Sequence, residues 1–291
     1  MSQADPLADA RDARAALERL LETRDLALPD RFSDRVEAFV RLLLDANARV
    51  NLTRIVEPQA VARLHLLDAL SAVPLIDELA PVSALDLGSG GGVPGIVLAL
   101  ARPGMPWTLV DSVRKKADAM RGFVSALELA GIVVVAERAE ILGRDRAHRG
   151  RYDVVTARAC AALPTLAEYA LPLVRVGGAV LAWKGAITDE ELHSGRAAAM
   201  LLGGELEVRP SGFAALGDHR FVLMRKSTAT PDRYPRRPGE PARRPLGVSR
   251  PTIQDAADLR RGRPAQIAQR ARERGYVPIT SRAPDLPAAL A

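Results

Sequence analysis

The feature that most constrains the fold is an apolar segment, residues 84–87, that runs directly into a glycine-dense turn. The turn and the residues after it read Gly88-Ser89-Gly90-Gly91-Gly92-Val93-Pro94-Gly95. Glycine has no Cβ, so it adopts positive φ values and lets a ligand approach the bare backbone. Four glycines in five positions carry an entropic cost that a plain surface loop has no reason to bear. We therefore predict a strand, a nucleotide-binding turn and a helix.

Two classes of nucleotide cofactor fit this turn. Gly90, Gly92 and Gly95 have the G-x-G-x-x-G spacing with which dinucleotide-binding folds bring a pyrophosphate to a helix N-terminus. Counted from Asp86, the same turn is an acidic residue followed by glycines at every second position, which is typical of S-adenosylmethionine-dependent methyltransferases. A nicotinamide (NAD)-dependent oxidoreductase therefore stands beside a methyltransferase as an alternative.

Further apolar segments predict the other strands of a parallel α/β sheet. They cover residues 107–111, 132–135, 152–156 and 178–183, and they are separated by helical segments at 113–130, 163–175 and 188–202. In an open parallel sheet, the ligand crevice lies outside the carboxyl ends of the strands. Residues that directly follow these strands are therefore the candidates for a binding site.

Two charged residues hold such positions. Asp111 comes about 20 residues after the glycines, where nucleotide-binding folds place a carboxylate for the ribose hydroxyls. Its alternative role is to cap the helix that starts near Val113. Arg158 offers a fork of donors to a carboxylate or a phosphate, and its alternative role is to pair with an acid such as Asp153.

The chain divides into three regions. Residues 1–80 carry apolar stripes at helical spacing, so we expect an N-terminal helical cap on the sheet. Residues 81–228 form the predicted cofactor-binding domain, and residues 229–291 form a tail rich in proline and arginine that we expect to be partly disordered. Residues 225–291 carry 15 basic and 6 acidic side chains, whereas the rest of the chain has a net charge of −3. Such a basic segment neutralises phosphates, which is consistent with an RNA partner.

A series of short motifs extends beyond the glycine turn. In order along the chain they are Asn51-Leu52-Thr53, Arg63-Leu64-His65-Leu66-Leu67-Asp68, Val110-Asp111-Ser112 with Lys115-Lys116, Arg138-Ala139-Glu140, Tyr152-Asp153-Val154-Val155-Thr156-Ala157-Arg158-Ala159, Glu168-Tyr169-Ala170-Leu171-Pro172-Leu173, Ala182-Trp183-Lys184-Gly185 and Tyr234-Pro235-Arg236-Arg237-Pro238-Gly239. Together with the turn, they resemble the glucose-inhibited division protein B group of bacterial small-subunit ribosomal RNA guanine-N7 methyltransferases. The resemblance runs from about residue 30 to residue 246. Val93 departs from it, because the family has a bulkier apolar residue there.

This resemblance implies a fold, a cofactor and a substrate. The fold is a class I, Rossmann-like methyltransferase with a mostly parallel seven-stranded sheet, helices on both faces and the helical cap. The cofactor is S-adenosyl-L-methionine, and the substrate is N7 of guanine-527 in 16S ribosomal RNA, within the small ribosomal subunit. The implied cofactor contacts are Gly88, Gly90, Val93, Asp111, Ala139, Glu140 and Arg158. The candidates for RNA contact are Arg63, His65, Lys115 and Lys184.

The implied reaction agrees with what the sequence lacks. Guanine N7 carries an in-plane lone pair and no proton, so its methylation needs no general base. Accordingly, the chain has no Ser-His-Asp order and no His or Cys cluster with metal-ligand spacing, and we expect neither a metal nor a conventional catalytic residue. Two further alternatives remain open, which are a methyltransferase of another substrate and a non-catalytic RNA-binding ribosome assembly factor.

Composition favours a cytoplasmic protein. Cys160 is the single cysteine, so an internal disulfide is excluded. No apolar run approaches the ~20 residues of a membrane span, and the N-terminal residues carry charges in place of a hydrophobic signal core. We therefore expect no membrane partner.

Overall fold

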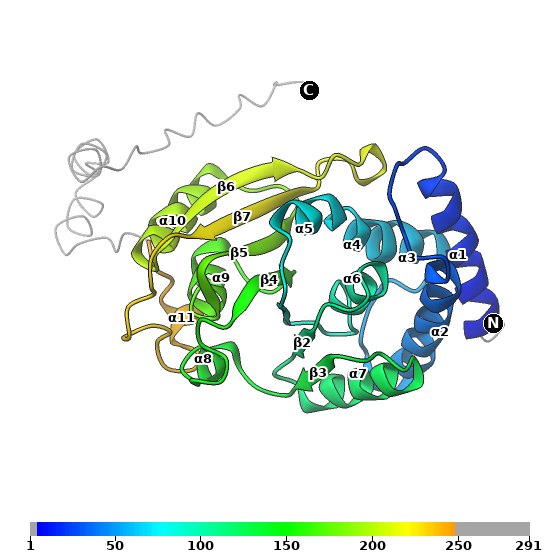
Figure 1. Cartoon of the computed structure of the whole chain (residues 1–291), viewed down its shortest axis with the longest axis horizontal. Helices are drawn as coiled ribbons and strands as arrows, with labels where there is room; N and C mark the ends of the chain where they lie inside the picture. Colours follow the sequence, from blue (N-terminus) through cyan, green and yellow to red (C-terminus); the bar gives the residue numbers. More distant parts are fainter. Residues whose placement is uncertain (1–4, 248–291) are drawn as a thin grey trace, which may run out of the picture. The chain divides into compact units, whose positions relative to one another are not determined.

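Seven strands build one sheet, and their residues match the apolar segments of the sequence. The strands are β1 (Ala84–Leu87), β2 (Trp107–Val110), β3 (Ile132–Val135), β4 (Tyr152–Arg158), β5 (Val174–Lys184), β6 (Gly204–Pro210) and β7 (Arg220–Lys226). In this computed structural model, which describes residues 5–247, their order is β3-β2-β1-β4-β5-β7-β6 (Figure 1). Strand β7 runs antiparallel to β5 and β6, and the other pairs are parallel. The predicted fold class is confirmed.

Helices cover both faces of the sheet. They are α6 (Gly95–Ala101), α7 (Arg114–Ala126), α8 (Ala139–Leu142), α9 (Leu163–Ala170), α10 (Asp189–Leu201) and α11 (Glu240–Arg243). Successive side chains of a strand point to opposite faces. Val154 accordingly packs in one core cluster with α6, α7 and the N-terminal helices, whereas Val155 packs in a second cluster with α9 and α10. This explains why β1 is buried at all four positions and β4 at every position but its last.

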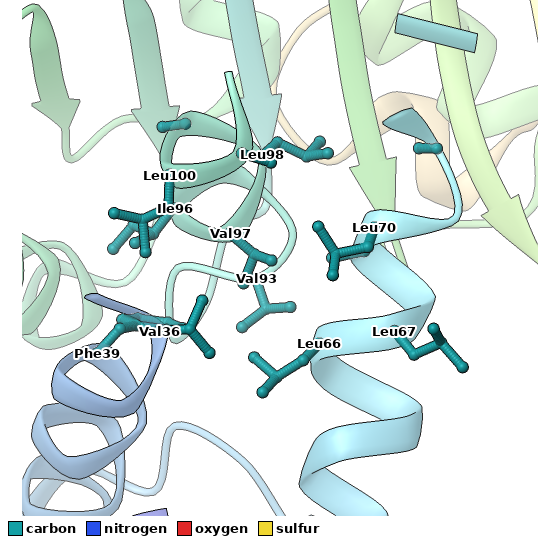
Figure 2. Close-up of a cluster of buried hydrophobic side chains, with 14 of the residues drawn as sticks. Val36, Phe39, Leu66, Leu67, Leu70, Val93, Ile96, Val97, Leu98 and Leu100 are labelled. Carbon is teal, nitrogen blue, oxygen red and sulfur yellow. The ribbon is translucent and has the colours of Figure 1, made fainter. Parts of the chain in front are cut away.

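The N-terminal cap is helical, as predicted. It consists of α1 (Pro6–Leu21), α2 (Phe32–Val50), α3 (Pro58–Val61), the π-helical segment η1 (Ala62–Leu67), α4 (Asp68–Leu70) and α5 (Val73–Leu79). Figure 2 shows Val36 and Phe39 of α2 and Leu66 and Leu70 of η1 and α4 gathered around α6 and Val93. The apolar side chain that follows the glycine turn is thus part of the core that joins the cap to the sheet.

Contrary to the expectation that no apolar run approaches a membrane span, the stretch Pro58–Leu79 is long and apolar enough to cross a membrane by length and composition. However, 72% of its most apolar window is buried inside the molecule, as in the core helix of a soluble fold. Its hydrophobicity is therefore accounted for by packing against α1 and α6.

Several boundaries differ from the sequence-based expectation: α7 ends at Ala126 and not at residue 130, and β5 begins at Val174 and not at residue 178. Two further differences concern α9 and the tail. The helix predicted over 163–175 ends at Ala170. Pro172 lacks the amide hydrogen that would continue the helix, and β5 already begins at Val174. The second boundary is the start of the tail, because residues up to Gly247 belong to the same compact unit as the sheet. Residues 229–247 follow β7 and pack beside α8 and α9 (Figure 1). The rest of the predicted tail, 248–291, lies outside the described residues.

Candidate functional site

The candidate site lies where the strand order reverses. From β1 the chain passes to β2 on one side, whereas β4 and β5 lie on the other, so the loops after β1 and β4 diverge around a crevice. A cavity of about 210 Å³ opens there. Its walls include four predicted cofactor contacts and two residues of the cap, namely Gly88, Gly90, Val93, Arg158, Thr53 and His65. Residues as far apart in the sequence as Thr53 and Arg158 thus converge on one cavity.

The glycine turn is held from below by Asp86. Gly88, Gly90 and Gly92 have φ values of +73°, +57° and +88°, which explains the need for glycine. The buried Asp86 carboxylate accepts hydrogen bonds from Ser89 Oγ at 2.7 Å, Thr156 Oγ1 at 2.7 Å and the Gly95 amide at 3.1 Å. Burial raises the pKa of Asp86, and these donors oppose that shift.

This arrangement disfavours the dinucleotide alternative. The first amide of α6 belongs to Gly95, and it is already bonded to the Asp86 carboxylate. Dinucleotide-binding folds direct that helix N-terminus at a pyrophosphate. A carboxylate in this position competes with a phosphate for the same amide and repels it.

Asp111 links the loop after β2 to the glycine turn. Its Oδ2 accepts a hydrogen bond from the Gly90 amide at 3.0 Å, and its Oδ1 accepts one from the Val113 amide at 2.8 Å. Val113 is the N-cap residue of α7, so the carboxylate also supports the start of that helix, without capping it in the usual way. The predicted ribose ligand is therefore fixed in orientation by backbone on two sides.

Arg158 pairs with the cap and not with the nearest acid in sequence. Its guanidinium donates to the Leu64 carbonyl at 2.7 Å and to Asp68 Oδ2 at 3.1 Å. Asp153 instead pairs with Arg175. The alternative role, pairing with an acid, is therefore confirmed with Asp68 and not with Asp153, because Arg158 and Asp153 lie at opposite ends of β4, roughly 16 Å apart.

His65 is a neutral hydrogen-bonded residue. A guanidinium only donates, so the 3.1 Å contact from Arg158 makes His65 Nδ1 an acceptor and assigns the proton to Nε2. Nε2 then donates to Thr53 Oγ1 at 2.8 Å. Burial, helped by the charge of Arg158, lowers the pKa of His65 to about 4.

Asp68 is the centre of this network. Its Oδ1 accepts from His219 Nδ1 at 2.9 Å while Oδ2 binds Arg158, and its carbonyl oxygen accepts from Trp183 Nε1 at 2.8 Å. Arg63 is exposed, whereas His65 and Asp68 are buried. Within residues 5–247, no group of three or more His, Cys, Asp or Glu side chains could hold a metal ion.

Comparison with known proteins decides the family. A model described as rRNA small subunit methyltransferase G matches residues 33–215. The chain belongs to this family. Ribosomal RNA small subunit methyltransferase G of Rubrobacter xylanophilus is 40% identical over 241 residues, which cover 81% of this chain and 92% of that protein. The namesake from Deinococcus radiodurans is 43% identical over 215 residues, covering 72% of this chain and 85% of that protein.

The O-methyltransferase from Bacillus cereus in complex with SAH has a TM-score of 0.49 and 15% sequence identity, covering 75% of this chain and 100% of that chain. Membership in the methyltransferase G family confirms the resemblance seen in the sequence motifs. It also favours a methyltransferase over the NAD-dependent oxidoreductase.

Two further predicted cofactor contacts, Ala139 and Glu140, are not among the residues that line this cavity. Ala139 and Glu140 open α8, and the Glu140 side chain is 2% exposed. Its Oε1 accepts from the Gly239 amide at 2.7 Å and from Arg138 at 3.1 Å. Burial raises the pKa of Glu140, but the two hydrogen bonds outweigh it, so the pKa is lowered. The carboxylate is therefore ionised.

The predicted RNA contacts have different surroundings. Lys184 is paired with Glu191 at 2.8 Å and also donates to the Ala161 carbonyl. Arg63 and Lys115 are exposed, whereas Lys116 lines the cavity. The sequence motif contained both Lys115 and Lys116. The phase of α7 decides which of the two faces the cavity, and residue type alone does not show this.

We expect His65 to make folding stability depend on pH. An unfolded histidine titrates near pH 6.5, whereas His65 in the fold has a pKa of about 4. Between these values the unfolded chain binds a proton that the folded chain does not, so stability falls as the pH drops through this window. At pH 5 the loss amounts to about 2 kcal/mol.

Denaturant unfolding near pH 7 and near pH 5 measures this loss. His65→Gln, which does not titrate, should lose less stability than the parent chain over the same interval. Titrating carboxylates affect the stability of both proteins equally, so their contribution cancels when the two stability losses are subtracted. Equal losses in the two proteins would refute the assignment.

Proposed function

We propose that the chain transfers a methyl group from S-adenosyl-L-methionine to N7 of guanine-527 in 16S ribosomal RNA, within the small ribosomal subunit of the cytoplasm. The observation that carries the cofactor half of this proposal is the Asp111 carboxylate, bonded to the Gly90 amide at the reversal of the strand order. A carboxylate at this point accepts hydrogen bonds from ribose hydroxyls beside bare backbone. Family membership supports the substrate half.

The residues present fit this cofactor. A Cβ built on Gly90 would meet no atom nearer than the Gly88 carbonyl oxygen at 3.9 Å, so an open space adjoins this backbone. We assign the ribose to Asp111 beside Gly88 and Gly90, and the adenine to Ala139 and Glu140. Val93 and Arg158 complete the set on the side of the cap.

The chemistry asks little of the protein beyond alignment. The bound cofactor supplies a sulfonium-linked methyl group, and the N7 lone pair forms the new C–N bond as the C–S bond breaks and its electrons remain on sulfur. The chain holds N7, carbon and sulfur in line, which contributes about 7–11 kcal/mol to lowering the barrier. His65 is neutral and Arg158 is paired with Asp68, so these two residues of the cavity wall add little positive charge next to a cationic cofactor.

Transfer of labelled methyl groups tests the proposal. The full chain is incubated with labelled S-adenosylmethionine and with small ribosomal subunits, or with protein-free 16S RNA, from a strain that lacks this protein. One labelled N7-methylguanine in the RNA, identified by mass spectrometry, is the expected result. Cofactor binding without labelling of either RNA would retain the cofactor site and overturn the substrate. A failure to bind the cofactor would overturn the whole proposal.

Replacement of Asp111 should weaken cofactor binding. In Asp111→Asn the shape is kept, but the charged acceptor is lost, so we expect a loss of about 1.5–3 kcal/mol in binding free energy. Isothermal titration with S-adenosylmethionine measures it. Asp118→Asn is the matched control, because Asp118 lies on the exposed side of α7 and pairs only with Arg121 among the described contacts. Equal affinities in the two variants would remove Asp111 from the site.

A further inference from the structure

The motif Tyr234-Pro235-Arg236-Arg237-Pro238-Gly239 does not line the cavity described above. It lies in residues 230–244, which we call the strap, and the strap runs beside α8 and α9 (Figure 1). We propose that the strap positions α8 for the adenine of the cofactor, with Arg236 and Gly239 as its positioning residues. This inference rests on the proposed function, because it takes Ala139 and Glu140 as the residues that contact the adenine.

The strap touches the beginning of α8 through Gly239. The Gly239 amide donates to Glu140 Oε1 at 2.7 Å, and Arg138 donates to the same oxygen at 3.1 Å. Both donors approach one oxygen, so the carboxylate is held from one side and its orientation is fixed. Gly239 has a φ of +79°, a conformation that glycine adopts without strain.

The strap also touches the end of α8. A Cβ built on Gly143, directly after the helix, would lie 2.8 Å from Pro235 Cγ, so the ring of Pro235 rests on this glycine. Arg149 joins the strap to the segment that follows α8, because its Nη1 donates to the carbonyls of Gly143 and Tyr234, both at 2.7 Å. Its Nη2 donates to the Thr230 carbonyl at 2.8 Å.

A buried ion pair anchors the strap itself. Glu168 on α9 is 0% exposed, and it accepts hydrogen bonds from the Arg236 amide at 2.7 Å and from Arg236 Nε at 2.9 Å. The guanidinium also reaches the second carboxylate oxygen. A planar fork on a carboxylate fixes both position and direction, which lysine does not do.

The length of α8 explains why this support matters. Residues Ala139–Leu142 make a single turn of helix, and a helix of one turn has no stability of its own in water. Its geometry is therefore set by its contacts, and the strap supplies them at both ends. Loosening the strap should displace Ala139 and Glu140, while the cavity at Gly88 and Arg158, where the methyl group is transferred, stays intact.

The expected signature is a change in cofactor binding with little change in turnover. Arg236→Lys keeps the charge and removes the fork, and Gly143→Ala drives a methyl group into Pro235. We expect each to raise the KM and the Kd for S-adenosylmethionine about tenfold, while kcat at saturating cofactor stays within about twofold. Arg237→Lys is the matched control, because Arg237 is the exposed neighbour in the same motif, and it should leave both constants unchanged.

The test combines titration of the cofactor alone, methyl-transfer kinetics and thermal unfolding of the full chain. Unchanged Kd in both Arg236→Lys and Gly143→Ala, even with a lower Tm, would overturn the inference, since the strap would then be only a structural element. A fall of kcat in both variants as large as the rise in Kd would overturn the inference as well. If Arg236→Lys does not fold, Gly143→Ala decides alone. Failure of the parent chain to bind S-adenosylmethionine would contradict the proposed function itself. Titration of the parent chain alone detects that failure, so it is distinguished from a failure of the inference.

Discussion

Asp68→Ala is expected to destabilise the chain by about 3–5 kcal/mol, because removal of one partner leaves a buried charge uncompensated. Asp68 holds Arg158 through one carboxylate oxygen and His219 through the other. The side chains of Arg158 and Asp68 are only 17% and 5% exposed, so water does not replace the lost partner. Equilibrium unfolding in denaturant at neutral pH measures the change.

The matched control for this variant is an exposed aspartate with an arginine partner. Asp118 and Arg121 are 59% and 46% exposed, and Asp118→Ala should change the free energy of unfolding by less than about 1 kcal/mol. If Asp68→Ala changed the free energy of unfolding as little as Asp118→Ala, the buried network would not contribute to stability. Cofactor binding by any folded Asp68→Ala protein should also be weaker, since Arg158 lines the cavity.

Gly95→Val is expected to abolish cofactor binding and to lower the free energy of unfolding by about 3 kcal/mol. A Cβ at position 95 would lie 2.5 Å from Leu109 Cδ2 and 2.8 Å from Asp86 Oδ2. The clash pushes Asp86 away from Ser89 and the Gly95 amide, which releases the turn on which the cofactor rests. Thermal unfolding and titration with S-adenosylmethionine report the two effects separately.

Gly122→Ala provides a control of opposite sign. Gly122 lies inside α7, and a Cβ there would meet no atom within 4 Å. Alanine should therefore stabilise the chain by roughly 0.5–1 kcal/mol through helix propensity alone. Wild-type affinity in Gly95→Val would show that Asp86 does not hold the turn in its binding conformation.

The parts of the fold that the sequence predicts are those coded by nearby residues. Strand β1, the glycine turn and Asp111 are visible because an apolar run, positive φ and a carboxylate at a fixed offset are local signals. Strands β6 and β7 were implied only by the family resemblance. Their antiparallel pairing with β5 depends on contacts distant in sequence, which periodicity does not reveal.

The buried network at the site escaped prediction for the same reason. Arg158 is five residues from Asp153 but 90 residues from Asp68, and sequence proximity offered only Asp153 as an example of an acidic partner. The π-helical turn of η1 also changes the phase of His65 relative to Asp68, which helical spacing does not anticipate. The one available signal was that both residues fell in a single family motif.

The same network determines when the fold is completed during synthesis. Asp68 leaves the ribosome with the cap, but its partners Arg158, Trp183 and His219 follow 90, 115 and 151 residues later. At about 5–20 residues per second, the cap waits roughly 8–30 seconds for its last buried partner. A chain that terminates before His219 lacks the partner of Asp68 Oδ1 and also β7, which pairs with both β5 and β6, so we expect an unstable fragment.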